Sequence, residues 1–214
     1  MGKLERDFFL RDTVEAARDL LGRYLVRNDG GETMVCLVTE TEAYVAAVDK
    51  ACHAYGGKRT ARTETLYAAP GTAYVYLIYG MYHCLNFITG PEGVASGILI
   101  RGCWPVWNAD GAARRRFGVP AGAMTAYQRK NFMNGPGKVC KGLAIDKSLN
   151  GLPLGGEALY LADAVPELGL PPRREPLPFR AGRRIGIDYA EEAIDFPWRF
   201  WIDERTIGGL HADL

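Results

Sequence analysis

Hydrophobic and polar positions in the first forty residues follow a helical pattern and then a strand pattern. Asp12 and Glu15 have the spacing of a capping box, and the apolar positions after them predict a helix over residues 12–22. Two apolar segments, at 24–26 and 34–42, flank the turn sequence Asn-Asp-Gly-Gly, which is typical of two strands joined by a tight turn.

The middle of the chain combines a polar segment with two apolar ones. Residues 45–72 are polar and contain a Gly-Gly pair, so they predict a long surface loop, a feature that is more often functional than idle. Residues 74–88 predict a second hairpin that turns near Gly80, and residues 97–101 predict another buried strand.

The remaining pattern mixes short helices and short strands. The expected elements are helix with polar interruptions at 108–132, a short helix after 134–137, strands at 157–161 and 198–202, and a connection rich in Pro and Arg at 171–184. No internal repeat or linker divides the sequence. We therefore predict a single α+β domain over residues 1–214, in which helices flank a mostly antiparallel, curved β-sheet with a protruding β-hairpin.

Composition narrows the protein class. Of the 214 residues, 48% are hydrophobic and 24% are charged, as in folded globular proteins. The N-terminus lacks the apolar region of a signal peptide, and no apolar run approaches the roughly 20 residues that cross a bilayer, so we expect no membrane partner. Five scattered cysteines without a CxxC pair favour reduced thiols in the cytoplasm over a disulfide framework or a zinc site.

The net charge of +1 does not indicate a nucleic-acid partner by itself, but its distribution is uneven. Basic residues gather in four clusters: Lys58, Arg59 and Arg62; Arg114, Arg115 and Arg116; Lys138, Lys141 and Lys147; and Arg173, Arg174, Arg180, Arg183 and Arg184. These clusters fit either ordinary solvated faces or a basic stripe across the surface.

Two glutamates end the apolar segment at 34–42. In a strand Glu40 and Glu42 point to the same face, with their Cα atoms roughly 6.5–7 Å apart. Such a pair could ligate a metal, perform acid–base chemistry or face solvent. Because the buried run Met-Val-Cys-Leu-Val leads directly into them, the carboxylates are expected to be rigid and partly dry, which suits a general base.

Tyrosines dominate the predicted hairpin. Tyr74 and Tyr76 share one face, and Tyr79 lies beside the turn at Gly80. Tyrosines in strands are usually core residues, but each hydroxyl needs a partner. The same rings could stack on nucleobases, and a tyrosine at the hairpin tip could wedge between base pairs.

Several stretches together resemble the alkyladenine (3-methyladenine, or methylpurine) DNA glycosylase family of base-excision repair. They are LLGRYLV, VTETEAY, DKACHAYGGKRTART, PGTAYVYLIYGMYHCLN, ILIR, GPGKVCKGLAID and PWRFWI. They occur in the family's order from Leu20 to Ile202, so the resemblance covers nearly the whole chain. ETEAY and YVYLIYGMYHCLN are highly specific together, whereas GPGKVC alone is not.

The resemblance implies a role for each matching residue. Glu42 corresponds to the catalytic residue that deprotonates the attacking water, and Arg101 to the arginine beside that water. Tyr44, His53 and Tyr76 correspond to the side chains that enclose the flipped base, Asn86 to the asparagine that restricts the pocket, and Tyr79 to the intercalating side chain. Without the resemblance, His53 and Arg101 would be read as ordinary loop and surface residues.

The resemblance also implies the reaction. The expected substrate is double-stranded DNA with an alkylated purine, a deaminated purine being a further candidate, and the N-glycosidic bond of that purine is hydrolysed to leave an abasic site. Lys58, Arg59, Lys138 and Lys141 are candidates for holding phosphates without reading sequence. No motif for a Schiff-base lysine is present, and no cofactor or metal is expected. We expect a monomer in the cytoplasm, associated with the nucleoid in a bacterium or located in the nucleus of a eukaryote.

Two other functions are considered from the residues alone. Glu40, Glu42, Asp49 and His53 could ligate a metal in a phosphodiesterase. Alternatively, a non-catalytic protein could stack single-stranded nucleic acid on its tyrosines, but a negative charge at position 42 would then repel phosphate. Neither explains the order of the motifs.

Overall fold

The computed structural model describes residues 2–153, 155–172, 177–203 and 205–207. Arg173 and Arg174 of the fourth basic cluster, and part of the predicted connection at 171–184, lie outside the described residues. In the part of the chain that is described, no helix combines the length and apolar character needed to cross a membrane.

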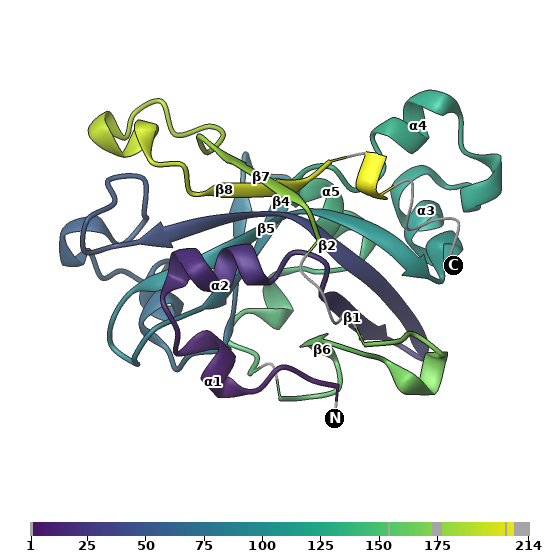
Figure 1. Cartoon of the computed structure of the whole chain (residues 1–214), viewed down its shortest axis with the longest axis horizontal. Coiled ribbons are helices and arrows are strands. Elements are labelled where there is room, and N and C mark those ends of the chain that lie inside the picture. Colours follow the sequence, from purple (N-terminus) through teal and green to yellow (C-terminus); the bar gives the residue numbers. More distant parts are fainter. Residues whose placement is uncertain (1, 154, 173–176, 204, 208–214) are drawn as a thin grey trace.

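A curved antiparallel sheet forms the centre of the molecule (Figure 1). Its strands within the described residues are β1 (Tyr24–Asp29), β2 (Glu32–Val45), β3 (Ala73–Ile78), β4 (Tyr82–Ile88), β5 (Ser96–Trp107), β6 (Leu159–Ala162), β7 (Phe179–Gly182) and β8 (Arg199–Ile202). The strand order is β3-β4-β5-β2-β1-β6, and β8 pairs with both β2 and β7. Every named strand pair is antiparallel, so the predicted α+β class with a curved antiparallel sheet is confirmed.

Short helices cover the sheet. The labelled α-helices within the described residues are α1 (Arg6–Phe9), α2 (Thr13–Asp19), α3 (Ala109–Phe117), α4 (Ala126–Lys130) and α5 (Pro136–Gly142). The 3₁₀ helices are Tyr55–Gly57, Glu64–Tyr67, Ala121–Ala123, Lys147–Leu149, Pro166–Leu168 and Glu191–Asp195. As predicted, Asp12 begins α2: its carboxylate accepts hydrogen bonds from the amides of Val14 and Glu15.

Two predicted elements differ from the structure, and one helix was not predicted. The interrupted helix expected over 108–132 is divided into separate pieces: α3 is terminated by Gly118, whose φ of 75° is left-handed, and the chain resumes as a 3₁₀ helix and then α4. The connection expected at 171–184 contains the strand β7, which pairs with β8. The residues of β7 do not show a strand pattern, so the sequence did not predict it. Helix α1 was not predicted, since four residues carry too little periodicity.

The long strand β2 is buried on both faces. Met34, Cys36 and Val38 pack into the main core with α2 and the middle of β5, while Val35 and Leu37 pack into a second cluster with β1 and β6. Burial on both sides explains why this segment is apolar at consecutive positions instead of alternating positions. It also gives the acidic end of β2 a rigid support.

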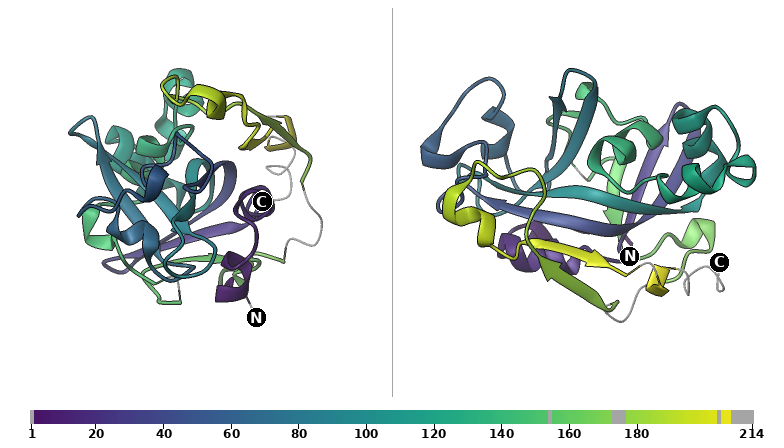
Figure 2. Two further views of the ribbon diagram at one scale, coloured as in Figure 1. Left: turned by 90° about the vertical axis from the view of Figure 1, so that its left-hand side faces the viewer. Right: turned by 90° about the horizontal axis from the view of Figure 1, so that it is seen from above.

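Strands β3 and β4 form a hairpin that projects from the sheet (Figure 2). The amide of Met81 donates to the carbonyl of Ile78 at 3.2 Å, and the two residues between them, Tyr79 and Gly80, have φ values of 53° and 68°. Positive φ at both positions is the geometry of a type I′ turn, which matches the twist of a hairpin. Glycine favours this conformation and tyrosine does not, so the turn holds Tyr79 in a strained, outward position.

Candidate active site

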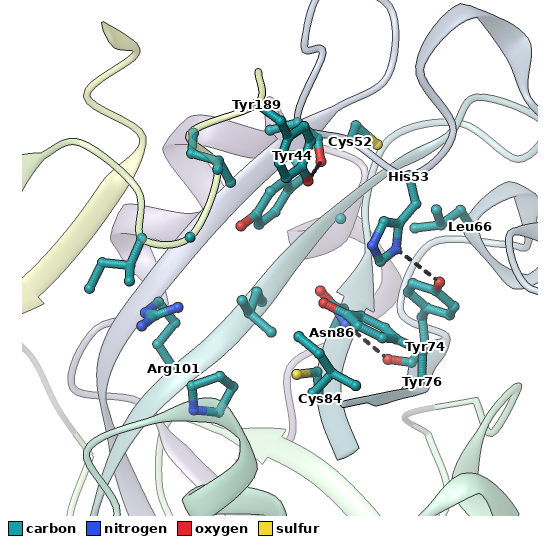
Figure 3. Close-up of a pocket in the computed structure, with 18 residues that line it drawn as sticks. Tyr44, Cys52, His53, Leu66, Tyr74, Tyr76, Cys84, Asn86, Arg101 and Tyr189 are labelled. Carbon is teal, nitrogen blue, oxygen red and sulfur yellow. Dashed lines mark hydrogen bonds between the residues drawn. The ribbon is translucent and has the colours of Figure 1, made fainter. Parts of the chain in front are cut away.

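A cavity of about 120 Å³ lies where the hairpin, the loop at 45–72, β5 and residues 185–189 meet (Figure 3). This space far exceeds the roughly 30 Å³ that one water occupies, so it admits a group of ring size. Five of the predicted site residues line it: Tyr44, His53, Tyr76, Asn86 and Arg101. The structure therefore brings together side chains from positions 44 to 101 that the sequence separates.

The carboxylate of Glu42 lies directly behind the cavity wall and is fully buried. Its Oε2 accepts the hydroxyl of Tyr44 at 2.7 Å, and its Oε1 accepts the amide of Ile185 at 2.8 Å. The same Oε1 is 3.4 Å from Nε of Arg101. Each carboxylate oxygen has two lone pairs, so these contacts orient the group and leave acceptor capacity.

Burial raises the pKa of Glu42 above its usual value, and the Arg101 guanidinium, the Tyr44 hydroxyl and the Ile185 amide oppose that rise. Burial also raises the pKa of Tyr44, and the neighbouring Glu42 carboxylate adds to the effect. Tyr44 therefore keeps its proton at neutral pH and remains a donor to Glu42. Its hydroxyl joins the buried carboxylate to the cavity.

Aromatic rings form the opposite wall of the cavity. The His53 ring packs edge-on against Tyr76, with centroids 4.7 Å apart, and Tyr74 lies 5.1 Å from Tyr76 on the same face of the hairpin. Nδ1 of His53 is 3.3 Å from the hydroxyl of Tyr74 (Figure 3). Burial, with help from the charges of Arg62 and Lys58, lowers the pKa of His53 to about 4, so the imidazole is neutral at physiological pH.

Asn86 closes one end of the cavity. Its side-chain amide donates to the carbonyl of Tyr74 at 3.2 Å, across the pairing of β3 with β4 (Figure 3). This bond fixes the orientation of the amide and leaves its oxygen for another donor.

Tyr79 lies outside the cavity, at the tip of the hairpin. Its side chain is 82% exposed, the highest value among the large hydrophobic residues of the described chain. Met81 beside it is also exposed, so the tip presents apolar surface to solvent. A tyrosine this exposed does not belong to the core. Its place at the tip of a projecting hairpin suits insertion between base pairs.

The four predicted phosphate contacts lie in two separate places, and none of them lines the cavity. Lys58 and Arg59 are exposed on the loop at 45–72, where Arg59 already forms a two-bond ion pair with Glu64. Lys138 and Lys141 lie on α5, and Nζ of Lys138 donates to Asn131 and Asn134.

Comparison with known proteins assigns the family. The family model described as methylpurine-DNA glycosylase (MPG) matches residues 7–206. The chain belongs to the methylpurine-DNA glycosylase family. The name places the chain among DNA glycosylases, hydrolases of DNA repair that act on alkylated bases.

Several relatives of the chain carry the name "Putative 3-methyladenine DNA glycosylase". The chain is 50% identical to one from Clostridium perfringens strain SM101 over 95% of its own length and 97% of that protein. It is 45% identical to one from Alkaliphilus oremlandii, over 95% and 96% of the two chains, and 44% identical to one from Clostridioides difficile, over 94% and 100%.

Sequence reasoning missed the part of the glycosylase site that comes from residues 184–189. The side chains of Arg184 and Asp49 form a fully buried ion pair, with contacts of 2.5 and 2.7 Å. The Arg184 guanidinium also lies 4.7 Å from the ring centre of Tyr44, and the next residue, Ile185, donates to Glu42. In the sequence Arg184 is only one of several arginines in its cluster. Nothing in the neighbouring residues indicates that its partner lies 135 residues away.

The structure does not assemble the metal site considered above for a phosphodiesterase. Asp49 is bound to Arg184, and its position is set by that pair. His53 faces Tyr74 and Tyr76 instead of the carboxylates of Glu40 and Glu42. Among the described residues of this glycosylase, no group of three or more His, Cys, Asp or Glu side chains has the geometry to hold a metal ion.

Proposed function

We propose that residues 1–214 act as one monomeric glycosylase domain that hydrolyses the N-glycosidic bond of damaged purines in duplex DNA. The observation that carries the proposal is the buried Glu42 carboxylate, linked to Arg101 and to the hydroxyl of Tyr44 at the edge of an aromatic cavity. The family assignment supports the substrate class.

The damaged nucleotide must leave the base stack to reach the cavity, at a cost of a few kcal/mol that damage reduces. Tyr79 fills the space that the nucleotide leaves, and Tyr44, His53 and Tyr76 enclose the everted base. A purine alkylated at N3 or N7 is positively charged, and electron-rich ring faces attract it by about 0.5–2 kcal/mol. The neutral state of His53 supports this role, because an imidazolium would repel such a base.

The chemistry needs a positioned water and a base. Glu42 accepts the proton of the water as its oxygen attacks the sugar carbon, and its negative charge stabilises the positive charge that develops on the sugar. Arg101 orients the carboxylate. An alkylated purine leaves readily, whereas a neutral purine such as hypoxanthine depends more on the enzyme.

The product is an abasic site in an intact strand. Strand cleavage by a bifunctional glycosylase needs an amine nucleophile that forms a Schiff base with the sugar. Among the described residues that line the cavity there is no lysine. The phosphate backbone is held by Lys58, Lys138 and Lys141, with Arg59 a weaker contributor because of its pair with Glu64.

Incubation with duplex oligonucleotides, each with one modified purine, tests the proposal. The panel contains 3-methyladenine, 7-methylguanine, ethenoadenine and hypoxanthine, with an unmodified duplex as control. We expect release of free base and strand breaks only after alkali, with the cationic purines excised fastest. Activity that EDTA abolishes, or strand cleavage without alkali, would contradict the proposal.

Replacing Tyr79 by alanine should slow excision from duplex DNA by roughly 10- to 100-fold, in line with the value of one aromatic stacking contact. The effect should nearly vanish on single-stranded DNA, where no gap needs filling. Tyr127→Ala is the matched control, since that tyrosine is 76% exposed but lies on α4. Equal losses on both substrates would argue against a wedge at position 79.

A further inference from the structure

Glu40, the other glutamate at the acidic end of β2, has no part in the mechanism above, yet it contacts the same arginine as Glu42. Oε1 of Glu40 accepts from Nε of Arg199 at 2.5 Å and from Nε of Arg101 at 3.2 Å. Nε of Arg101 is in turn 3.4 Å from Oε1 of Glu42. Two carboxylates therefore share one guanidinium, and Arg199 adds a second positive charge on the outer side.

The side chains of this network are largely removed from solvent. Their exposed fractions are 16% for Glu40, 12% for Arg101 and 24% for Arg199. Such shielding makes the ion pairs stronger and better ordered than pairs on an open surface. The network is thus a fixed support behind Arg101, its member that lines the cavity.

The backbone is shaped to bring Glu40 to this position. The pairing of β2 with β5 shifts register on both sides of Glu40, which is the mark of a β-bulge. Gly102 lies opposite, and a Cβ there would come within 3.0 Å of Cβ of Glu40. On the other edge, β8 pairs with β2 and supplies Arg199. Bulges of this kind re-aim a side chain, here toward Arg101.

We propose that Glu40 is a positioning residue that holds Arg101 against Glu42, and that Arg199 holds Glu40 in place. The inference rests on the proposed function, because it takes Glu42 to be the general base. Arg101 has several rotatable bonds, and a second carboxylate restricts them to the arrangement that faces Glu42. Glu40 acts only through Arg101 and does not touch the DNA base.

The charges around Glu42 set the direction of the pH effects. The titratable and charged groups that act on it are Glu40 and Tyr44 from β2, Cys84 from β4, Arg101 from β5 and Arg184 before the last 3₁₀ helix. Arg199 of β8 lies opposite Glu42 in the strand pairing and binds Glu40. After burial, Arg101 is the strongest influence and lowers the pKa of Glu42, while Glu40 raises it. Removing the charge of Glu40 without releasing Arg101 should therefore lower that pKa.

Single-turnover excision by Glu40→Ala and Glu40→Gln tests the inference, with the fastest-excised purine of the panel as substrate. The alanine variant should be about 10- to 100-fold slower, the typical cost of a displaced catalytic group. The glutamine variant should retain most activity, because its amide oxygen still accepts from both arginines. The acid limb of its pH–rate profile should move to lower pH, because the pKa of Glu42 falls. Glu32→Ala, on the same strand and paired with Arg115, should excise at the unaltered rate.

Coupling to Arg101 separates this role from a general structural one. In an Arg101→Met background, Glu40→Ala should cause no further loss, since the residue through which it acts is gone. Normal excision by Glu40→Ala, an equal loss in the Arg101→Met background, or an acid limb of Glu40→Gln that does not move would overturn the inference. If Glu42→Gln remained active, the proposed function would fail instead.

Discussion

Replacing Glu42 by glutamine should reduce base excision by about 10²- to 10⁴-fold, the usual contribution of a general base. Glutamine has nearly the same shape, and its oxygen can still accept from Tyr44 or Ile185, so the cavity should keep its form. What it loses is the ability to take a proton and the negative charge that faces the sugar. The loss should be smaller for cationic purines, which leave readily, than for hypoxanthine.

The same substitution should not destabilise the protein at neutral pH. Burial raises the pKa of Glu42 in the folded state, so the fold favours the neutral form of this group. Its contribution to stability is therefore greatest at low pH and falls as pH rises from the unfolded pKa through the folded one. Glutamine removes that dependence, and the free energy of unfolding above this window should be unchanged or higher.

Three measurements decide the Glu42 prediction: single-turnover excision, DNA affinity and thermal unfolding, each beside Glu32→Gln as a control on the same strand. Lost excision with intact affinity and unfolding midpoint is the expected result. Near-normal excision by a folded Glu42→Gln variant would show that Glu42 is not the general base and would overturn the mechanism proposed for this site.

Local sequence patterns predicted much of the fold. The alternation around Tyr74 and Tyr76 predicted a hairpin with both rings on one face, and the apolar run before Glu40 predicted a buried strand, because side-chain direction follows directly from strand geometry. The reach of Glu40 to Arg101 was not predictable, since it depends on a bulge and on the register of a strand sixty residues later.

Site residues whose role depends on an ion pair with a residue far away in the sequence were equally unpredictable from the sequence. Nothing near Arg184 distinguishes it from Arg183, yet one side chain is fully buried and the other is 70% exposed. The difference comes from how residues 183–196 cross the end of β2, which only the folded chain defines. Resemblance to the family supplied Glu42, Tyr44 and His53 but not their neighbours in this segment.

Replacing Asp49 by asparagine should lower the free energy of unfolding by about 3–5 kcal/mol, the typical cost of removing one partner from a buried ion pair. Both side chains of the Asp49–Arg184 pair have no exposed surface. The remaining hydrogen bonds of the Arg184 guanidinium are to the carbonyls of Ala43 and Ala193, which carry no compensating charge. An asparagine would leave the guanidinium charged and buried without an anion.

The neighbouring pair of Arg183 and Asp195 provides the matched control. It joins the same segment at 2.5 Å, but its side chains are 70% and 68% exposed, so water and salt screen it. Arg183→Met should leave the midpoint of urea unfolding nearly unchanged, whereas Asp49→Asn should lower it strongly. Equal midpoints for the two variants would show that the buried pair does not hold this segment.

The Asp49 substitution should also slow excision, even where the variant is kept folded by low temperature. Arg184 supports the ring of Tyr44 and precedes Ile185, whose amide holds the Glu42 carboxylate. Loosening the segment therefore releases two of the contacts that orient Glu42. The loss should appear in the single-turnover rate more than in DNA affinity, because the disturbed contacts hold the base and not the phosphates. A variant that unfolds more easily but excises normally at low temperature would show that this ion pair contributes to stability and not to excision.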